Sequence, residues 1–205
     1  LRQSGVVAGF SVEKAEQAVP LCRALLAGGI DIVELTLRSS AGMDAVCAIS
    51  SQVPEMLLGV GTILSPEQAT EVAAAGAAFG LAPGINPRVV RAAQEARLPF
   101  APGICTPSDL EAAIELGCRF VKYFPAEPMG GLAFLRSMAA PYRHLGIQYF
   151  PLGGLNETNM LDYLMEPDVP AVGGSWIVRQ EMVKGEDWAG LTERAAAVFQ
   201  KLRLR

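Results

Sequence analysis

The chain has 205 residues, 51% of them hydrophobic, so one domain can form a substantial core. Its net charge is −4 and no Lys/Arg cluster occurs, which argues against a nucleic-acid partner. No apolar stretch approaches the roughly 20 residues that span a bilayer. No basic segment precedes an apolar one, as it would in a secretory signal. We therefore expect a cytoplasmic protein that binds neither nucleic acid nor membrane.

The sequence offers no set of metal ligands. The only histidine, His144, has no acidic or cysteine partner at ligand spacing. The cysteines show no C-x-x-C pairing, so we expect reduced thiols with a packing role. They are Cys22, Cys47, Cys105 and Cys118. We expect a function that needs neither a metal nor another cofactor.

Short runs rich in β-branched residues alternate with runs of helical period along the whole chain. The predicted strands span residues 5–10, 32–37, 57–60, 78–81, 100–101, 120–124, 148–150 and 171–172. The predicted helices span residues 12–27, 42–52, 66–75, 87–96, 107–116, 132–140, 157–165 and 188–202.

The ends of several helices are marked in the sequence. Ser65, Asn86 and Thr106 each precede a proline, the pattern of an N-cap residue followed by proline at the first helical position. Three predicted helices end at glycines, which can adopt the left-handed conformation. They are Gly28–Gly29, Gly76 and Gly117.

Such alternation predicts either an open doubly wound sheet or a closed barrel. An open dinucleotide-binding sheet should carry G-x-G-x-x-G after its first strand, and that motif is absent. Unusual residues instead follow almost every strand, as at the carboxyl face of a barrel. The pattern therefore predicts an α/β fold, a (β/α)8 TIM barrel, as a single domain over residues 1–205.

Lys122 stands out among the lysines because it lies in the apolar strand FVKYFP. A charged ammonium is poorly hydrated there, which favours the neutral, nucleophilic amine. The alternatives are a lysine that reaches solvent from the strand end and one buried in an ion pair. The other lysines, Lys14, Lys184 and Lys201, lie in polar or helical segments and should be solvated.

Glu34 is the corresponding acidic anomaly, in the strand IVELTLR. By period two, Glu34, Thr36 and Arg38 share one strand face, which would be the barrel interior. A carboxylate and a guanidinium there suit proton transfer and recognition of a substrate carboxylate. The alternative is a structural Glu34–Arg38 salt bridge. Lys122 weakens that alternative, because the two strands would direct a base and an amine into one cavity.

Two glycine pairs follow the seventh and eighth predicted strands, Gly153–Gly154 and Gly173–Gly174, the second followed by Ser175. In barrels this location commonly binds phosphate through backbone N–H groups. The two pairs together indicate a phosphate site, although one pair alone would be weak evidence.

At these residues the sequence resembles the KHG/KDPG aldolase family. The matching segments are ELTLRS (34–39), GVGTILSPEQ (59–68), APGI (82–85), PGICTPSDLE (102–111), VKYFPAE (121–127), LGGLNETN (152–159) and GGSW (173–176). The resemblance implies a homotrimeric barrel that cleaves 2-keto-3-deoxy-6-phosphogluconate, or a close 2-keto-3-deoxy acid, to pyruvate and an aldehyde. The aldehyde would be glyceraldehyde 3-phosphate or glyoxylate.

The resemblance also implies roles for individual residues. Lys122 would form the Schiff base and Glu34 would transfer protons. Arg38 and Thr62 would contact the keto acid, and Pro83 and Phe124 would form pocket walls. The phosphate end would consist of Gly153, Gly154, Gly174 and Ser175.

The sequence departs from the family pattern in two places. Leu152 stands where members that act on the gluconate phosphate usually have threonine, and an apolar residue there resembles the galactonate branch. The first strand, residues 6–10, lacks the usual proline or arginine features, and no leading helix precedes it. We therefore expect a different preference for the substrate's hydroxyl stereochemistry and a natural chain that extends further at its amino end.

Two other functions fit part of the pattern. A phosphate-binding barrel isomerase or epimerase would use Lys122 only electrostatically and would not be trapped by a keto acid. A catalytically silent module would bind sugar phosphates without reaction, but retention of Glu34, Arg38 and Lys122 together argues against it.

Overall fold

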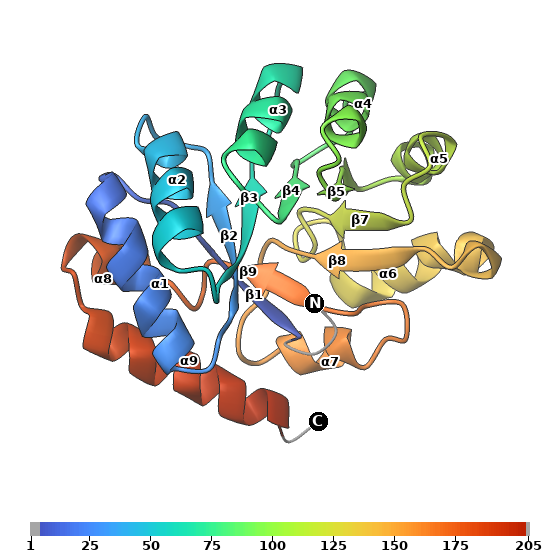
Figure 1. Cartoon of the computed structure of the whole chain (residues 1–205). Helices are drawn as coiled ribbons and strands as arrows, with labels where there is room; N and C mark the ends of the chain where they lie inside the picture. Colours follow the sequence, from blue (N-terminus) through green and yellow to red (C-terminus); the bar gives the residue numbers. More distant parts are fainter. Residues whose placement is uncertain (1–4, 204–205) are drawn as a thin grey trace.

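The computed structural model describes residues 5–203, which form parallel strands surrounded by helices (Figure 1). The strands are β1 Val6–Phe10, β2 Ile32–Thr36, β3 Leu57–Gly61, β4 Phe79–Leu81, β5 Phe100–Ala101, β6 Gly103–Ile104, β7 Phe120–Tyr123, β8 Gln148–Pro151 and β9 Val172–Gly174. The α-helices are α1 Ala18–Ala27, α2 Gly42–Gln52, α3 Pro66–Ala74, α4 Pro87–Glu95, α5 Pro107–Glu115, α6 Gly131–Ala139, α7 Met160–Leu164, α8 Gln180–Lys184 and α9 Trp188–Arg203. Two 3-10 helices occur, η1 Ala15–Gln17 and η2 Ala140–Leu145.

All strand pairs are parallel and fall into two sheets, ordered β5-β4-β3-β2-β1-β9 and β6-β7-β8. A single bridge between Leu152 and Gly173 connects the end of β8 to β9. The strands curl, and the helices lie around the outside of the curl (Figure 1). The carboxyl ends of the strands therefore meet at one edge, where parallel α/β folds bind ligands.

The elements predicted from the alternating pattern are present, with three differences in the strands and helices. The predicted fifth strand continues beyond Pro102 as β6, and the ladder is interrupted at Pro102 because proline has no N–H to donate. Helix α8 was not predicted, because its five residues are too short for a helical period to show. The predicted helix over residues 12–27 begins later, as η1 followed by α1.

The predicted helix starts are confirmed. Ser65, Asn86 and Thr106 each have extended backbone angles and accept a hydrogen bond from a backbone N–H in the first helical turn. Each cap satisfies an N–H group that the helix itself cannot pair. These local interactions fix where α3, α4 and α5 leave the sheet. None of the helices within residues 5–203 is long and apolar enough to cross a membrane.

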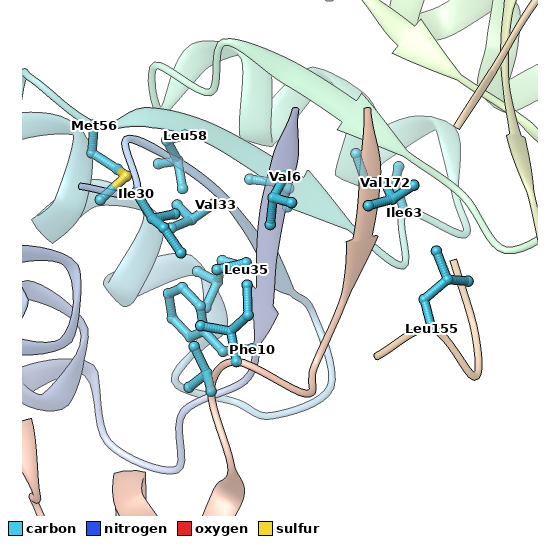
Figure 2. Close-up of a cluster of buried hydrophobic side chains, with 14 of the residues drawn as sticks. Val6, Phe10, Ile30, Val33, Leu35, Met56, Leu58, Ile63, Leu155 and Val172 are labelled. Carbon is cyan, nitrogen blue, oxygen red and sulfur yellow. The ribbon is translucent and has the colours of Figure 1, made fainter. Parts of the chain in front are cut away.

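Two apolar layers hold the fold together. The larger lies between the outer face of the sheet and the helices and includes Val33, Leu35 and Phe10 (Figure 2). The smaller lies inside the curl and includes Ile32 and Phe150. Because side chains alternate along a strand, the neighbours of Val33 and Leu35 on β2 face this interior.

Candidate active site

A cavity of about 330 Å³ opens at the carboxyl ends of the strands, above the inner apolar layer. Eight of the ten residues predicted for the site line it: Glu34, Arg38, Lys122, Phe124, Gly153, Gly154, Gly174 and Ser175. Its other lining residues are Gly9, Phe10, Ser11, Thr36, Leu152, Leu155, Val178 and Gln180.

Lys122 and Glu34 form an ion pair at the base of this cavity. The Lys122 Nζ atom lies 3.1 Å from Glu34 Oε1 and donates a hydrogen bond to it. Lys122 is 5% exposed and Glu34 is 2% exposed. Water screens such a pair poorly, so the amine and the carboxylate interact more strongly than they would on the surface. The arrangement places a primary amine within hydrogen-bond distance of a carboxyl group, out of bulk water.

The backbone around Glu34 leaves room for its carboxylate. A Cβ atom on Gly61 of β3 would overlap the Glu34 carboxyl group. On the other side, a Cβ atom on Gly9 of β1 would lie 3.6 Å from Glu34 Oε2. The acid therefore needs glycine at position 61, whereas a Cβ atom at position 9 would make an ordinary van der Waals contact with it.

The segment that carries Lys122 is held by its neighbours. Tyr123 points to the opposite side of β7, is buried, and its hydroxyl donates to the carbonyls of Ala126 and Gly131, at 3.3 Å each. Burial raises the pKa of Tyr123 to about 12, so the hydroxyl stays a donor. Within the cavity the Lys122 Nζ atom lies 5.0 Å from the centroid of the Phe124 ring. The Phe124 ring thus lies beside the amine, and both residues line the cavity.

Arg38 lies at the mouth of the cavity and is exposed, two residues beyond the end of β2. Glu34, Thr36 and Arg38 all line the cavity, as the period of two predicts. Glu34 pairs with Lys122 rather than Arg38, and within residues 5–203 no ion pair joins Glu34 to Arg38. The arginine is thus available to an anionic ligand. The sequence left two alternatives for Lys122, a side chain that reaches solvent and a buried ion pair. The structure shows the buried ion pair, with Glu34 as the partner.

The glycine pairs lie at the end of the cavity formed by β8 and β9. Gly153 and Gly154 both have positive φ angles, 94° and 84°, which side chains rarely adopt. A Cβ atom on Gly154 would also collide with Glu127, because the loop after β7 packs directly against it. Glu127 donates its backbone N–H to the Gly153 carbonyl at 3.0 Å. Glycine here lets two loops approach closely and leaves the cavity wall without side chains.

Thr62 and Pro83 do not line the cavity. Thr62 follows Gly61 directly and has a φ of 63°, a left-handed conformation that is strained in a β-branched residue, by about 1–3 kcal/mol. Such strain concentrates at functional sites. Pro83 is half-buried, and its carbonyl group occupies the space that a Cβ atom on Gly103 would need.

Sequence reasoning did not assign several lining residues. Gly9, Phe10 and Ser11 lie at the carboxyl end of β1. Their place after a predicted strand could have marked them as site residues, because barrels bind ligands at that end of their strands. Gln180 lies at the start of the unpredicted helix α8, so no sequence pattern marked it. Among the described residues, no group of three or more His, Cys, Asp or Glu side chains could hold a metal ion.

A buried lysine paired with a carboxylate at the carboxyl edge of a parallel α/β sheet defines an enzyme site with an amine nucleophile. Comparison with known proteins identifies the family. The family model for KDPG and KHG aldolase matches residues 1–194, and the chain belongs to this family.

Individual relatives are similar over almost their whole length. The KHG/KDPG aldolase of Escherichia coli (strain K12) is 38% identical over 199 residues, covering 97% of this chain and 92% of the relative. The 2-dehydro-3-deoxy-phosphogluconate aldolase of Dickeya dadantii (strain 3937) is 40% identical, covering 93% and 88%. The KDPG aldolase of Legionella pneumophila, solved with pyruvate as a covalent carbinolamine intermediate, has a TM-score of 0.91 and 36% identity, covering 95% and 94%.

Proposed function

We propose that this protein is a Schiff-base (class I) aldolase that cleaves 2-keto-3-deoxy-6-phosphogluconate, or a close 2-keto-3-deoxy acid, to pyruvate and an aldehyde. The observation that carries the proposal is the buried Lys122–Glu34 pair, 3.1 Å apart in a cavity with an arginine at its mouth. The family of the chain and the covalent pyruvate adduct of the Legionella relative support it.

In the first half of the reaction, the neutral Lys122 Nζ attacks the C2 ketone of the substrate. The carbinolamine that results loses water and becomes an iminium ion, with Glu34 supplying and removing the protons. The positive iminium nitrogen is the electron sink that a ketone alone does not provide.

In the second half, Glu34 takes the proton of the C4 hydroxyl and the C3–C4 bond breaks. The electron pair of that bond enters the iminium, which gives an enamine on Lys122 and releases the aldehyde. Protonation of the enamine at C3 and addition of water to the resulting iminium then release pyruvate and restore the amine.

The remaining residues bind and orient the substrate. Arg38 would hold the substrate carboxylate, with Thr62 as a second contact and Pro83 and Phe124 as walls. Thr62 and Pro83 do not line the cavity, so their assignments rest on the family resemblance. Gly153, Gly154, Gly174 and Ser175 would bind the phosphate through backbone N–H groups.

The proposal extends to the whole molecule. The chain is one domain, and its strands form a closed (β/α)8 barrel in which β5 and β6 are parts of one strand. The single-residue interruption at Pro102 and the Leu152–Gly173 bridge support closure. The protein acts as a cytoplasmic homotrimer. Exposed apolar side chains such as Leu64 and Met165 support this assembly, because contacts between subunits would bury them. A measured molar mass in solution tests it.

Trapping with pyruvate and borohydride tests the chemistry. We expect inactivation and one pyruvate-derived group per chain, located on Lys122 by mass spectrometry. The other lysines serve as internal controls, because Lys14 and Lys184 are exposed and Lys201 is half-buried on α9. Labelling of those lysines without Lys122 would remove the mechanism. No adduct at all would favour an isomerase or epimerase without a covalent intermediate.

A further inference from the structure

Arg194 lies on α9, outside the cavity, and its side chain is 23% exposed. Its guanidinium makes three hydrogen bonds to two different loops. Nη2 donates to the Trp176 carbonyl at 2.7 Å and Nε donates to the Ile177 carbonyl at 3.2 Å. Nη2 also lies 3.4 Å from Glu157 Oε1. A single planar group thus spans both loops.

Both loops form the same end of the cavity. The loop after β9 contributes Ser175 and Val178 to its lining, and the loop after β8 contributes Gly154 and Leu155. Arg194 does not line the cavity and connects the two loops through its contacts with Trp176, Ile177 and Glu157. Its bonds therefore act on the shape of the glycine-pair end and not on Lys122.

Helix α9 gives Arg194 a fixed position. The neighbouring Thr192 hydroxyl donates to the Ala24 carbonyl of α1 at 3.1 Å. The two helices approach so closely that a Cβ atom on Gly28 would collide with Ala195. A guanidinium carried by such a tightly packed helix can hold a loop in one conformation.

The two carbonyls that Arg194 binds determine where the next amides point. In a trans peptide the C=O and the following N–H point in opposite directions. With the Trp176 and Ile177 carbonyls directed at Arg194, the N–H groups of Ile177 and Val178 are directed away from it. Within residues 5–203 neither N–H has a hydrogen-bond acceptor. Two successive unpaired amides that point the same way can donate to one anion, and Val178 lines the cavity.

We infer that Arg194 is a positioning residue for the phosphate end of the cavity: it orients the backbone amides of residues 177–178 and keeps the two glycine loops together. The inference rests on the proposed function, because it assigns these loops to the substrate's phosphate. The planar fork of Arg194 is the feature that acts, since it binds two loop carbonyls, whereas the carboxylate that faces its charge, Glu157, is shared with Lys201. Arg194 itself does not touch the substrate.

The test compares anion binding with chemistry at Lys122 in the same variants. Arg194→Gln removes fork and charge, whereas Arg194→Lys keeps the charge and loses the fork. Lys201→Gln is the matched control, since Lys201 pairs with the same Glu157 at 3.5 Å but binds no loop carbonyl. For each protein, calorimetry gives the Kd of 3-phosphoglycerate, and borohydride trapping gives the rate of pyruvate addition to Lys122.

We expect both Arg194 variants to raise the Kd of 3-phosphoglycerate roughly 10- to 100-fold, the scale of effect of misplaced binding groups. The trapping rate should stay within about twofold, and Lys201→Gln should match the unchanged protein in both measurements. A normal Kd in Arg194→Lys would overturn the inference, because charge and not the fork would then matter. An equal loss of trapping and binding would also overturn it, since the role would be general stability.

The two levels of the proposal fail separately. If the unchanged protein does not bind 3-phosphoglycerate while pyruvate still labels Lys122, the phosphate end and Arg194's role are wrong and the aldolase chemistry stands. If pyruvate does not label Lys122, the proposed function itself is wrong.

Discussion

Within residues 5–203, Glu34 and Lys122 form ion pairs with each other only, so a change in one removes the hydrogen-bond partner of the other. Glu34→Gln keeps the shape of the side chain but cannot accept the C4 hydroxyl proton. We expect kcat to fall by about 10²-fold or more, the usual contribution of a general acid or base.

Pyruvate should still bind to the Glu34→Gln protein, because Arg38 remains to hold its carboxylate, but its addition to Lys122 should slow because Glu34 also transfers protons in that step. Steady-state kinetics measures kcat, and the binding of pyruvate to the same preparation is the folding control. Normal turnover in this variant would place proton transfer on another group, such as an ordered water.

Leu152 is the residue most relevant to substrate stereochemistry. It lines the cavity, is 4% exposed, and offers a substrate hydroxyl no hydrogen-bond partner. A hydroxyl buried against it loses about 1–3 kcal/mol, or roughly 5- to 150-fold in kcat/KM. We expect the protein to discriminate poorly between the gluconate and galactonate epimers, or to accept an unphosphorylated keto acid.

The substitution Leu152→Thr restores a hydroxyl partner at this position. It should shift kcat/KM towards the gluconate-type substrate, measured by pyruvate release from both epimers. A strong native preference for that substrate, together with no gain in Leu152→Thr, would show that other residues determine the stereochemistry.

At the scale of elements, α7 supports the loop that follows the lysine strand. The buried Tyr163 of α7 donates its hydroxyl to Glu127 Oε1 at 2.5 Å. Burial, followed by this hydrogen bond, raises the pKa of Tyr163 above its usual value, so the hydroxyl remains protonated. The bond links α7 to the loop that packs against Gly154.

Tyr163→Phe should lower the free energy of unfolding by about 0.5–1.5 kcal/mol, because the buried tyrosine loses its hydrogen bond to Glu127, an exposed residue whose carboxylate can then turn to water. Tyr142→Phe is the matched control: its hydroxyl bonds Glu111 at 2.8 Å on the surface, and its loss should change stability by less than about 0.5 kcal/mol. Urea denaturation measures both. Equal effects of the two substitutions would mean that the Tyr163–Glu127 bond stabilises the fold no more than the surface Tyr142–Glu111 bond does.

Across the whole molecule, the curl of the sheet gives each strand two apolar environments. One face packs against the helices and the other fills the interior, so β2 and β7 each carry apolar residues on both sides. Glu34 and Lys122 occupy the last interior positions before the cavity, beyond Ile32 and Phe120 on their own strands. The final helix, α9, returns beside α1 (Figure 1) and from there binds the glycine loops.

The sequence alone determined the features that depend on neighbours along the chain. The order of elements followed from hydrophobic period, and the caps at Ser65, Asn86 and Thr106 followed from side chains that bond within one helical turn. Lys122 and Glu34 stood out because a charge in an apolar strand is costly unless it has a partner or a function. Each of these signals is local, so no knowledge of the fold was needed.

Only the tertiary structure decided which residues meet. The Lys122–Glu34 pair joins positions 88 residues apart, and its distance depends on strand register and curvature. The same geometry left Thr62 and Pro83 outside the cavity lining and placed Gln180 within it. Arg194 lies on an ordinary helical pattern, and its bonds to two loop carbonyls exist because α9 packs on α1. Such contacts arise from the packing of distant elements, which no local pattern encodes.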